Sequence, residues 1–303
     1  MTPGHPVTAV NEVRRGGVFG VAAYLLWGFF PLYFHVLAPA TPLEILAHRI
    51  LWSFVFCVFV LVWQRDLSWV RPVVARPRLL LGLVAAALAV AVNWGVYVSA
   101  VADGRVRDAA LGYFLNPLIT VALGVVLLRE PLRWLQWAAV AIGALGAAYL
   151  TVAGGALPVT ALTVAVTFAL YGLLKKRLGA NLDALHGLSI ETLVLLPGAL
   201  ALLGPLTWLG GDHAGFESPG RAVGLIVTGP VTAIPLLLFA AAARRVPLVT
   251  IGLLQFLTPV MQLLCSVVLG EVITSAQWVG FVIVWAALAV LTADSLRQRA
   301  APA

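Results

Sequence analysis

The stretch REPLRWLQW (residues 129–137) returns 141 residues later as GEVITSAQW (residues 270–278). A glutamate, a glutamine and a tryptophan occupy the same positions in both stretches. Further upstream the spacing is 142, so that the dipeptide NP at 116–117 lies over TP at 258–259. An ordered set of matches at a nearly constant spacing indicates that the chain contains an internal repeat.

Each repeat contains apolar stretches long enough to span a membrane. Hydrophobic residues make up 62% of the chain, charged residues only 10%, and the mean hydropathy is +1.02, whereas a soluble domain has about 25% charged residues. A membrane-spanning helix needs about 20 apolar residues. We therefore expect an all-α integral membrane protein with ten transmembrane helices, at residues 17–35, 41–63, 79–101, 109–128, 132–150, 157–174, 186–203, 220–242, 248–269 and 275–296.

Basic residues gather in every second loop. If the N-terminus is inside, the inner segments hold 15 Lys and Arg residues, the outer loops hold three, and Arg49 lies within the second expected helix. Because basic loops stay on the cytoplasmic side, both termini should be cytoplasmic. The net charge of +7 follows from this orientation signal and does not indicate nucleic acid. The expected parts are an N-terminal tail (1–16), a first five-helix repeat (17–150), a second five-helix repeat (157–296) and a C-terminal tail (297–303).

The loop charges also indicate that the second repeat is inverted. Five helices are an odd number, so the second repeat should cross the membrane in the opposite sense to the first. Arg129 and Arg133 follow the fourth expected helix, whereas no basic residue follows the ninth. The uncharged turn after the first helix corresponds to the basic run 175–177 after the sixth. Inverted repeats of this kind are typical of secondary transporters.

The chain resembles RarD-type EamA permeases, a branch of the drug/metabolite transporter superfamily. The resemblance rests on short motifs in order along nearly the whole chain: YLLWGFFPLYF (24–34), PLEILAHRILWS (42–53), NWGVYVSAV (93–101), LGYFLNPL (111–118), YGLLKK (171–176), LSIETL (188–193) and GPVTAIPLLLFAAAARR (229–245). It implies a ten-helix fold and transport activity. It does not identify a substrate.

Two polar stripes are the main candidates for a substrate cavity. Tyr113, Asn116 and Thr120 are spaced to share one face of the fourth expected helix. The repeat offset places them over three polar residues of the ninth helix, Gln255, Thr258 and Gln262. A proline next to each stripe, Pro117 and Pro259, should free a carbonyl and kink its helix, as a gate would require. Hydrogen bonding between packed helices is the alternative explanation of the stripes.

Aromatic and amide residues on other helices extend this candidate set. Trp27 on the first expected helix lies over Tyr171 on the sixth, and each is followed by a glycine that allows close helix approach. Asn93 and Tyr97 lie one turn apart on the third helix. We expect these side chains to contribute to the cavity, although aromatic residues near helix ends are more often interface anchors.

Arg49 is the most costly residue to bury, at about 2.5–3.5 kcal/mol on insertion scales, and should have a counter-charge. Glu44 precedes it by five residues, about 140° around the helix, which disfavours pairing. Glu191 on the seventh expected helix is the better partner, and Glu44 and Glu191 are repeat equivalents at an offset of 147. Two roles stay open for Arg49, a clamp with Glu191 or a substrate contact.

His48 lies four residues after Glu44 and four before Trp52, which places all three on one helix face. A Glu–His pair inside a membrane is a candidate proton relay. The alternative is that His48 is a hydrogen-bonded residue near the membrane interface.

Other functional classes lack their motifs. The chain has no G-x-x-x-x-G-K-[ST] run for ATP, no H-E-x-x-H and no G-x-S-x-G. Cys57 and Cys265 fall inside expected helices, which predicts neither a disulfide nor a metal site. We therefore expect no cofactor, no enzyme activity and a secondary carrier of the bacterial inner membrane. Its expected partners are the lipid bilayer and a small, partly apolar metabolite or amphipathic drug. A channel and a membrane scaffold or sensor are the alternatives, and the sequence does not define an oligomeric state.

Overall fold

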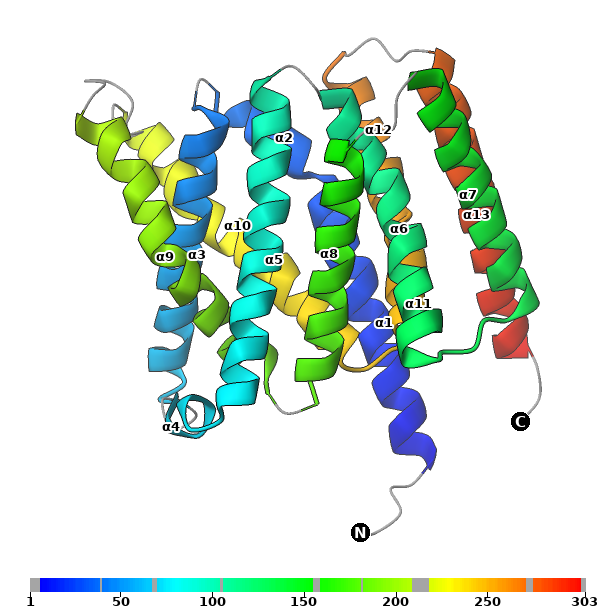
Figure 1. Ribbon diagram of the computed structural model, residues 1–303, viewed down its shortest axis with the longest axis horizontal. Helices are drawn as coiled ribbons and strands as arrows, with labels where there is room; N and C mark the ends of the chain where they lie inside the picture. Colours follow the sequence, from blue (N-terminus) through cyan, green and yellow to red (C-terminus); the bar gives the residue numbers. More distant parts are fainter. Residues whose placement is uncertain are drawn as a thin grey trace.

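The structure is a computed structural model that describes residues 6–38, 40–66, 70–103, 106–154, 159–180, 182–208, 218–270 and 275–300. Within these ranges the regular elements are all α-helices (Figure 1). They are α1 (Pro6–Gly28), α2 (Phe30–Val36), α3 (Pro42–Trp63), α4 (Val70–Val74), α5 (Pro77–Ala102), α6 (Val106–Leu128), α7 (Trp134–Gly154), α8 (Val159–Leu178), α9 (Ala184–Trp208), α10 (Pro219–Ala243), α11 (Leu248–Leu254), α12 (Leu257–Val268) and α13 (Ser275–Ala300).

Seven helical segments of the described chain are long and apolar enough to cross a membrane. Three shorter apolar helices, Trp134–Tyr149, Leu248–Gln262 and Trp278–Asp294, fall where the fifth, ninth and tenth spans were expected. The expected all-helical chain with multiple membrane spans is thus confirmed. The count of ten crossings and the cytoplasmic termini stay predictions.

The first expected span is two helices rather than one. α1 begins at Pro6, well before residue 17, so its polar first turns are also helical. Glu12 in these turns pairs with Arg245 (2.8 Å), which lies between α10 and α11. The helix is interrupted at Phe29, just before Pro31. Proline has no N–H to bond the carbonyl four residues earlier, so an interruption there is favoured.

The ninth expected span is also divided, into α11 and α12, and Pro259 explains the position of the break. Gln255 and Phe256 separate the two helices. Because Pro259 cannot donate to the Gln255 carbonyl, that carbonyl accepts from the Thr258 N–H at 3.1 Å. The matching residue of the first repeat behaves differently, since α6 continues unbroken through Pro117. The sequence predicts a kink at both Pro117 and Pro259, and the structure interrupts the helix only near Pro259.

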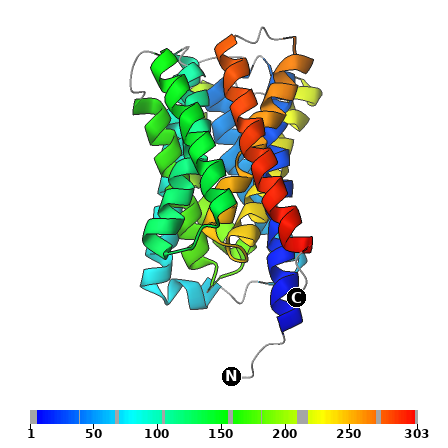
Figure 2. The same cartoon turned by 90° about the vertical axis from the view of Figure 1, so that its right-hand side faces the viewer.

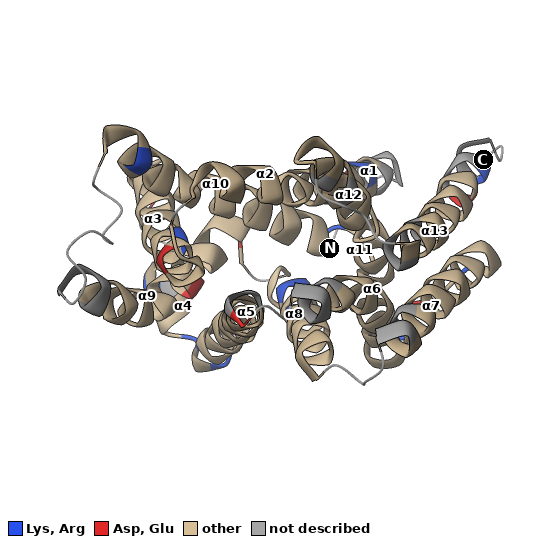
Figure 3. Ribbon diagram, turned by 90° about the horizontal axis from the view of Figure 1, so that it is seen from above, with Lys and Arg blue, Asp and Glu red and all other residues tan. Residues whose placement is uncertain are grey.

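Eight segments form a ring in which helices from the two halves of the chain alternate. The order of contacts is α3, α10, α1 with α2, α11 with α12, α6, α8, α5 and α9, which returns to α3. Seen from above, this ring surrounds the centre of the molecule (Figure 3). Each pair of neighbours in the ring thus comes from opposite halves of the sequence.

α7 and α13 lie outside the ring. They pack against each other and against α6 and α12, respectively (Figure 2). Arg133, just before α7, forms an ion pair with Asp294 of α13. The two helices therefore flank the ring on the side of α6 and α12.

α1 begins and α13 ends at the same end of the bundle (Figure 1). We call this end the terminus end and the opposite one the far end. α3 and α10 begin at the far end, whereas α5 and α9 begin at the terminus end. Arg65 and the basic loops 129–133 and 244–247 follow helices that finish at the terminus end.

Candidate functional site

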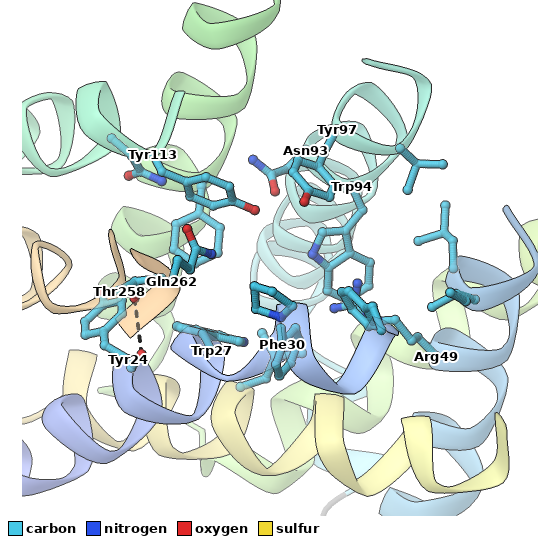
Figure 4. Close-up of a pocket in the computed structure, with 18 of the residues that line it drawn as sticks. Tyr24, Trp27, Phe30, Arg49, Asn93, Trp94, Tyr97, Tyr113, Thr258 and Gln262 are labelled. Carbon is cyan, nitrogen blue, oxygen red and sulfur yellow. Dashed lines mark hydrogen bonds between the residues drawn. The ribbon is translucent and has the colours of Figure 1, made fainter. Parts of the chain in front are cut away.

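A cavity of about 340 Å³ lies inside the ring. Ligand sites in proteins generally measure about 300–1,000 Å³, so this space suits a small molecule. It reaches from the last turns of α1 to Pro42, the first residue of α3 at the far end. Its lining consists of Tyr24, Trp27, Phe30, Pro31, Phe34, Pro42, Ile45, Leu46, Arg49, Asn93, Trp94, Tyr97, Val98, Tyr113, Asn116, Phe168, Leu236, Gln255, Thr258, Pro259 and Gln262 (Figure 4).

Many candidates from the sequence meet in this lining. They are Trp27, Arg49, Asn93, Tyr97, Tyr113, Asn116, Gln255, Thr258, Pro259 and Gln262. Outside the lining lie Glu44, His48, Pro117, Thr120, Tyr171 and Glu191. The residues that meet come from both halves of the chain, because α1, α3, α5 and α6 belong to the first half whereas Gln255 and α12 belong to the second.

The two polar stripes contact each other through Thr120, which is fully buried behind the lining. Its hydroxyl lies 3.0 Å from Asn116 Oδ1 and 3.4 Å from Gln255 Oε1. A hydroxyl has one hydrogen to donate, so it can serve one of these acceptors at a time. The Thr258 hydroxyl instead donates to the Tyr24 carbonyl (3.2 Å), close to the interruption between α1 and α2. The stripes therefore contribute both cavity lining and contacts between helices.

Asn93 also combines the two roles that its sequence context left open. Its Nδ2 donates to the Val164 carbonyl (2.7 Å) and lies 3.3 Å from Thr167 Oγ1, which ties α5 to α8. Next along α5, Tyr97 packs edge-on against Tyr113 of α6, with ring centroids 5.8 Å apart. Helix packing thus fixes the orientation of these polar and aromatic cavity residues.

The expected ion pair between Arg49 and Glu191 is wrong. Glu191 pairs with Lys175 (Oε1 to Nζ, 2.7 Å) and accepts a hydrogen bond from the Tyr171 hydroxyl (3.1 Å). The reason is depth. Arg49 lies two turns from the start of α3 at the far end, and Glu191 lies two turns from the start of α9 at the terminus end. Two inverted helices place these positions near opposite membrane faces.

Arg49 instead contacts a hydroxyl and three aromatic rings. Its Nε donates to Thr232 Oγ1 of α10 (3.0 Å). Its Cζ lies 4.7 Å from the centre of the Trp94 ring, 5.4 Å from that of Phe30 and 5.5 Å from that of Phe34. Each of these distances is within the range of a cation–π contact.

Glu44 and His48 face neighbouring helices rather than the cavity. Glu44 completes a capping box with Thr41 at the start of α3 and lies 3.3 Å from Arg221 Nη2 of α10. His48 Nδ1 accepts a hydrogen bond from Trp52 Nε1 (3.2 Å), which confirms their common helix face. This arrangement fits helix packing directly, and a proton relay stays a hypothesis.

The sequence matches the EamA-like transporter family over residues 14–152 and again over 158–293. The chain belongs to the EamA-like transporter family. It is 43% identical to protein RarD of Streptomyces exfoliatus (95% of this chain, 91% of that one) and 35% identical to protein RarD of Escherichia coli (94% and 96%). It is 42% identical to an uncharacterized transporter of Pseudomonas aeruginosa (96% and 97%). A solved crystal structure shares the fold at 17% identity, with a TM-score of 0.69 over 91% of this chain and 98% of that one.

The family match and these relatives identify the chain as a multi-pass membrane transporter of the drug/metabolite type. They also confirm the resemblance to RarD. The family and the relatives' names indicate transporters rather than enzymes. Nothing in these names states what is carried.

Sequence reasoning missed part of this EamA-family cavity, namely its apolar walls. Phe30 and Phe34 of α2, Trp94 of α5 and Phe168 of α8 line the space. Phe30 and Phe34 are four residues apart, so they share one helix face, with ring centroids 5.3 Å apart. An aromatic side chain in a membrane protein can equally well contact lipid, pack in the core or line a cavity. The sequence therefore carried no signal that singled these four out.

Toward the terminus end the cavity is closed by packed aromatic rings. Trp27 packs against Phe168 and Phe239 (centroids 5.7 and 5.6 Å), and Tyr171 stacks on Phe239 (5.8 Å, 12° between planes). Beyond the rings, on the same side, lies the buried pair of Lys175 and Glu191. Packed aromatic rings and, beyond them, an ion pair thus bound the cavity on the side of the terminus end.

Proposed function

We propose that this EamA-family protein is a secondary carrier of the bacterial inner membrane for small metabolites or amphipathic drugs. Its central cavity would be exposed alternately to the two sides of the membrane. The observation that carries the proposal is the position of the cavity, which is enclosed between helices of both halves of the chain. Inverted-repeat transporters bind substrate at such an interface and rock one unit against the other.

The proposed units are the two five-helix repeats, 17–150 and 157–296, with both termini in the cytoplasm. The order of contacts in the ring supports these two units. α1, α3 and α5 of the first repeat correspond to α8, α9 and α10 of the second. Each of these helices packs against the repeat counterparts of the helices that its own counterpart contacts. The loop charges support the orientation. With that orientation, a cavity that reaches the far end and is closed toward the terminus end faces outward.

The proposed substrate contacts are the amide and phenol groups of the lining, on Asn93, Tyr97, Tyr113, Asn116, Gln255 and Gln262, with Thr258 and the Trp27 ring. The break at Gln255–Phe256, next to Pro259, is the proposed hinge, since a divided helix can change direction without losing further hydrogen bonds. Glu44 and Glu191 are proposed as clamps at the two ends, where each pairs with a basic residue of another helix.

A thermal-shift screen of purified protein in detergent tests the proposal, with Asn116→Ala and Gln255→Ala beside the wild type. Ligand at 100 times Kd stabilises a protein by about 2.7 kcal/mol, so a substrate should raise the melting temperature of the wild type and of neither variant. Gln64→Ala, an exposed glutamine at the end of α3, is the matched control and should respond like the wild type.

Counterflow in proteoliposomes then separates the functional classes. A carrier should exchange labelled for unlabelled ligand with saturation, and Gln255→Ala should abolish the exchange. Flux without saturation would indicate a channel. Binding without flux would indicate a sensor. Equal stabilisation of wild type and both cavity variants would place the binding site elsewhere.

A further inference from the structure

The cavity lining contains one charged side chain, Arg49, among the residues that the structure describes. The other polar groups of the lining are amides, phenols, a threonine hydroxyl and two tryptophan N–H groups. Arg49 is 8% exposed and lies in the third turn of α3. A cation at this depth is costly unless it is paired or faces water, which marks it as a functional candidate.

No carboxylate of the described chain forms an ion pair with Arg49. The buried acids are occupied elsewhere: Glu44 lies beside Arg221, Glu191 beside Lys175 and Asp294 beside Arg133. The cavity therefore carries a net positive charge at one end, and no described side chain neutralises it.

The contacts of the Arg49 guanidinium leave its most directional donors available. Nε–H is used by Thr232, and the rings of Trp94, Phe30 and Phe34 contact the cation without accepting its in-plane N–H groups. A guanidinium has five N–H donors, so four remain on the two terminal nitrogens. Within the described residues none accepts from them. This pair of parallel donors matches the two oxygens of a carboxylate.

Figure 4 shows Arg49 at one end of the pocket and Thr258, Gln262 and Tyr113 at the other, with Trp27 between them. The two ends therefore differ in charge, and the walls between them are largely aromatic. A second negative charge on a ligand would meet only neutral groups at the Gln262 end. A cationic ligand would meet Arg49 without any acid to offset the repulsion.

We propose that the cavity is selective for organic monoanions, in which one carboxylate binds Arg49 and an apolar, preferably aromatic body lies between Trp27, Trp94 and Tyr97. The proposal rests on the proposed function, since it assigns a substrate class to the same cavity. Amphipathic monocarboxylates should bind better than their neutral amides, their cationic analogues and dicarboxylates of similar size.

The test compares ligands that differ only in charge. Sodium phenylacetate and sodium indole-3-acetate are titrated against phenylacetamide and indole-3-acetamide, at one pH and constant sodium chloride, with the melting temperature of the purified protein as the readout. A charge-assisted pair of hydrogen bonds should make each acid bind at least about tenfold more tightly than its amide. This comparison uses wild-type protein and needs no variant.

Arg49→Gln assigns the preference to its residue. The variant strands no carboxylate, so it should fold, and it should bind acid and amide equally. Arg49→Lys keeps the charge without the fork and should retain only part of the preference. Arg297→Gln removes an exposed cation that contacts Trp134 outside the cavity, and it should keep the full preference of the wild type.

Several outcomes would overturn the proposal. Acids that shift the melting temperature no more than their amides would exclude a monoanion site, whether both bind or neither does. If both bind and Asn116→Ala abolishes both, the cavity and the proposed function survive without the charge preference. Equal shifts in all cavity variants would remove the proposed function as well. Equal stabilisation by sodium chloride alone would reduce Arg49 to a site for simple anions.

Discussion

Breaking the pair of Lys175 and Glu191 should be among the most destabilising single changes in this protein. The two side chains are only 5% and 2% exposed, their charged atoms are 2.7 Å apart, and Tyr171 adds a hydrogen bond to the same carboxylate. Removing one member of a buried pair strands the other charge and costs about 3–5 kcal/mol. Lys175→Met leaves Glu191 with one neutral donor, so we expect a loss within that range.

Glu191→Gln should cost somewhat less, about 3 kcal/mol, because the amide oxygen can still accept from Lys175 and Tyr171. The double variant Lys175→Met with Glu191→Gln removes both charges at once. Replacing a buried pair by neutral groups is often nearly neutral, so the double variant should lie within about 1 kcal/mol of the wild type. The variants are thus expected to be strongly non-additive.

The assay is reversible unfolding in mixed micelles, followed by circular dichroism, with a double-mutant cycle on the free energies of unfolding. The pair of Asp183 and Arg244 serves as the control, since its side chains are 48% and 25% exposed and such pairs contribute at most about 1 kcal/mol. If the losses of the two single variants simply add in the double variant, the two charges are not coupled and the reasoning fails.

Three further predictions address packing, capping and pH. Gly229→Ala should lower the melting temperature, because its methyl group would overlap the backbone of Trp52 where α10 meets α3, at a cost of about 1–3 kcal/mol; Gly198→Ala in α9 meets no atom within 4 Å and should be neutral or slightly stabilising. Glu130→Ala should lower stability by about 1–2 kcal/mol in the same assay, because that carboxylate accepts both N–H groups at the start of α11 (2.9 and 2.8 Å); an unchanged value would exclude the cap. Burial raises the pKa of Asp183, but a backbone N–H and a nearby arginine lower it more, so the pKa in the folded protein lies below its usual value. The ionised Asp183 should therefore stabilise the protein slightly at neutral pH, and this contribution should decline below about pH 4. The pH profile of Asp183→Asn should lack that decline.

Helix positions and the polar stripes could be predicted because both depend on local periodicity. An apolar segment of sufficient length predicts a membrane-spanning helix whichever helices it packs against. The stripe at Tyr113 and Asn116 needed only the helical repeat to place it on one face, and the repeat offset located its partner at Gln255. The chemistry of proline indicated where a helix could break, but the chain is divided near Pro259 and continuous through Pro117, so local chemistry alone did not decide between them.

Long-range pairing could not be predicted in the same way. The Arg49–Glu191 prediction used the rule that a buried charge needs an opposite charge, but oppositely directed helices place these two positions near opposite ends of the bundle. The actual partners are set by which helix ends meet: Glu44 meets Arg221 and Glu191 meets Lys175. Sequence spacing contains no information on that choice.

The distribution of the buried charges gives the strongest reason to test the cavity with anions. Three buried acids of the described chain each lie beside a base, and in each case the pair links two different segments of the chain. Of the two buried bases, Lys175 takes part in one of these links, whereas Arg49 faces the cavity. A structural clamp would need a fourth acid near Arg49, and Thr232 supplies only a neutral hydroxyl. Because an uncompensated charge is unfavourable in this setting, a negative ligand that reaches it gains binding free energy that a neutral one does not.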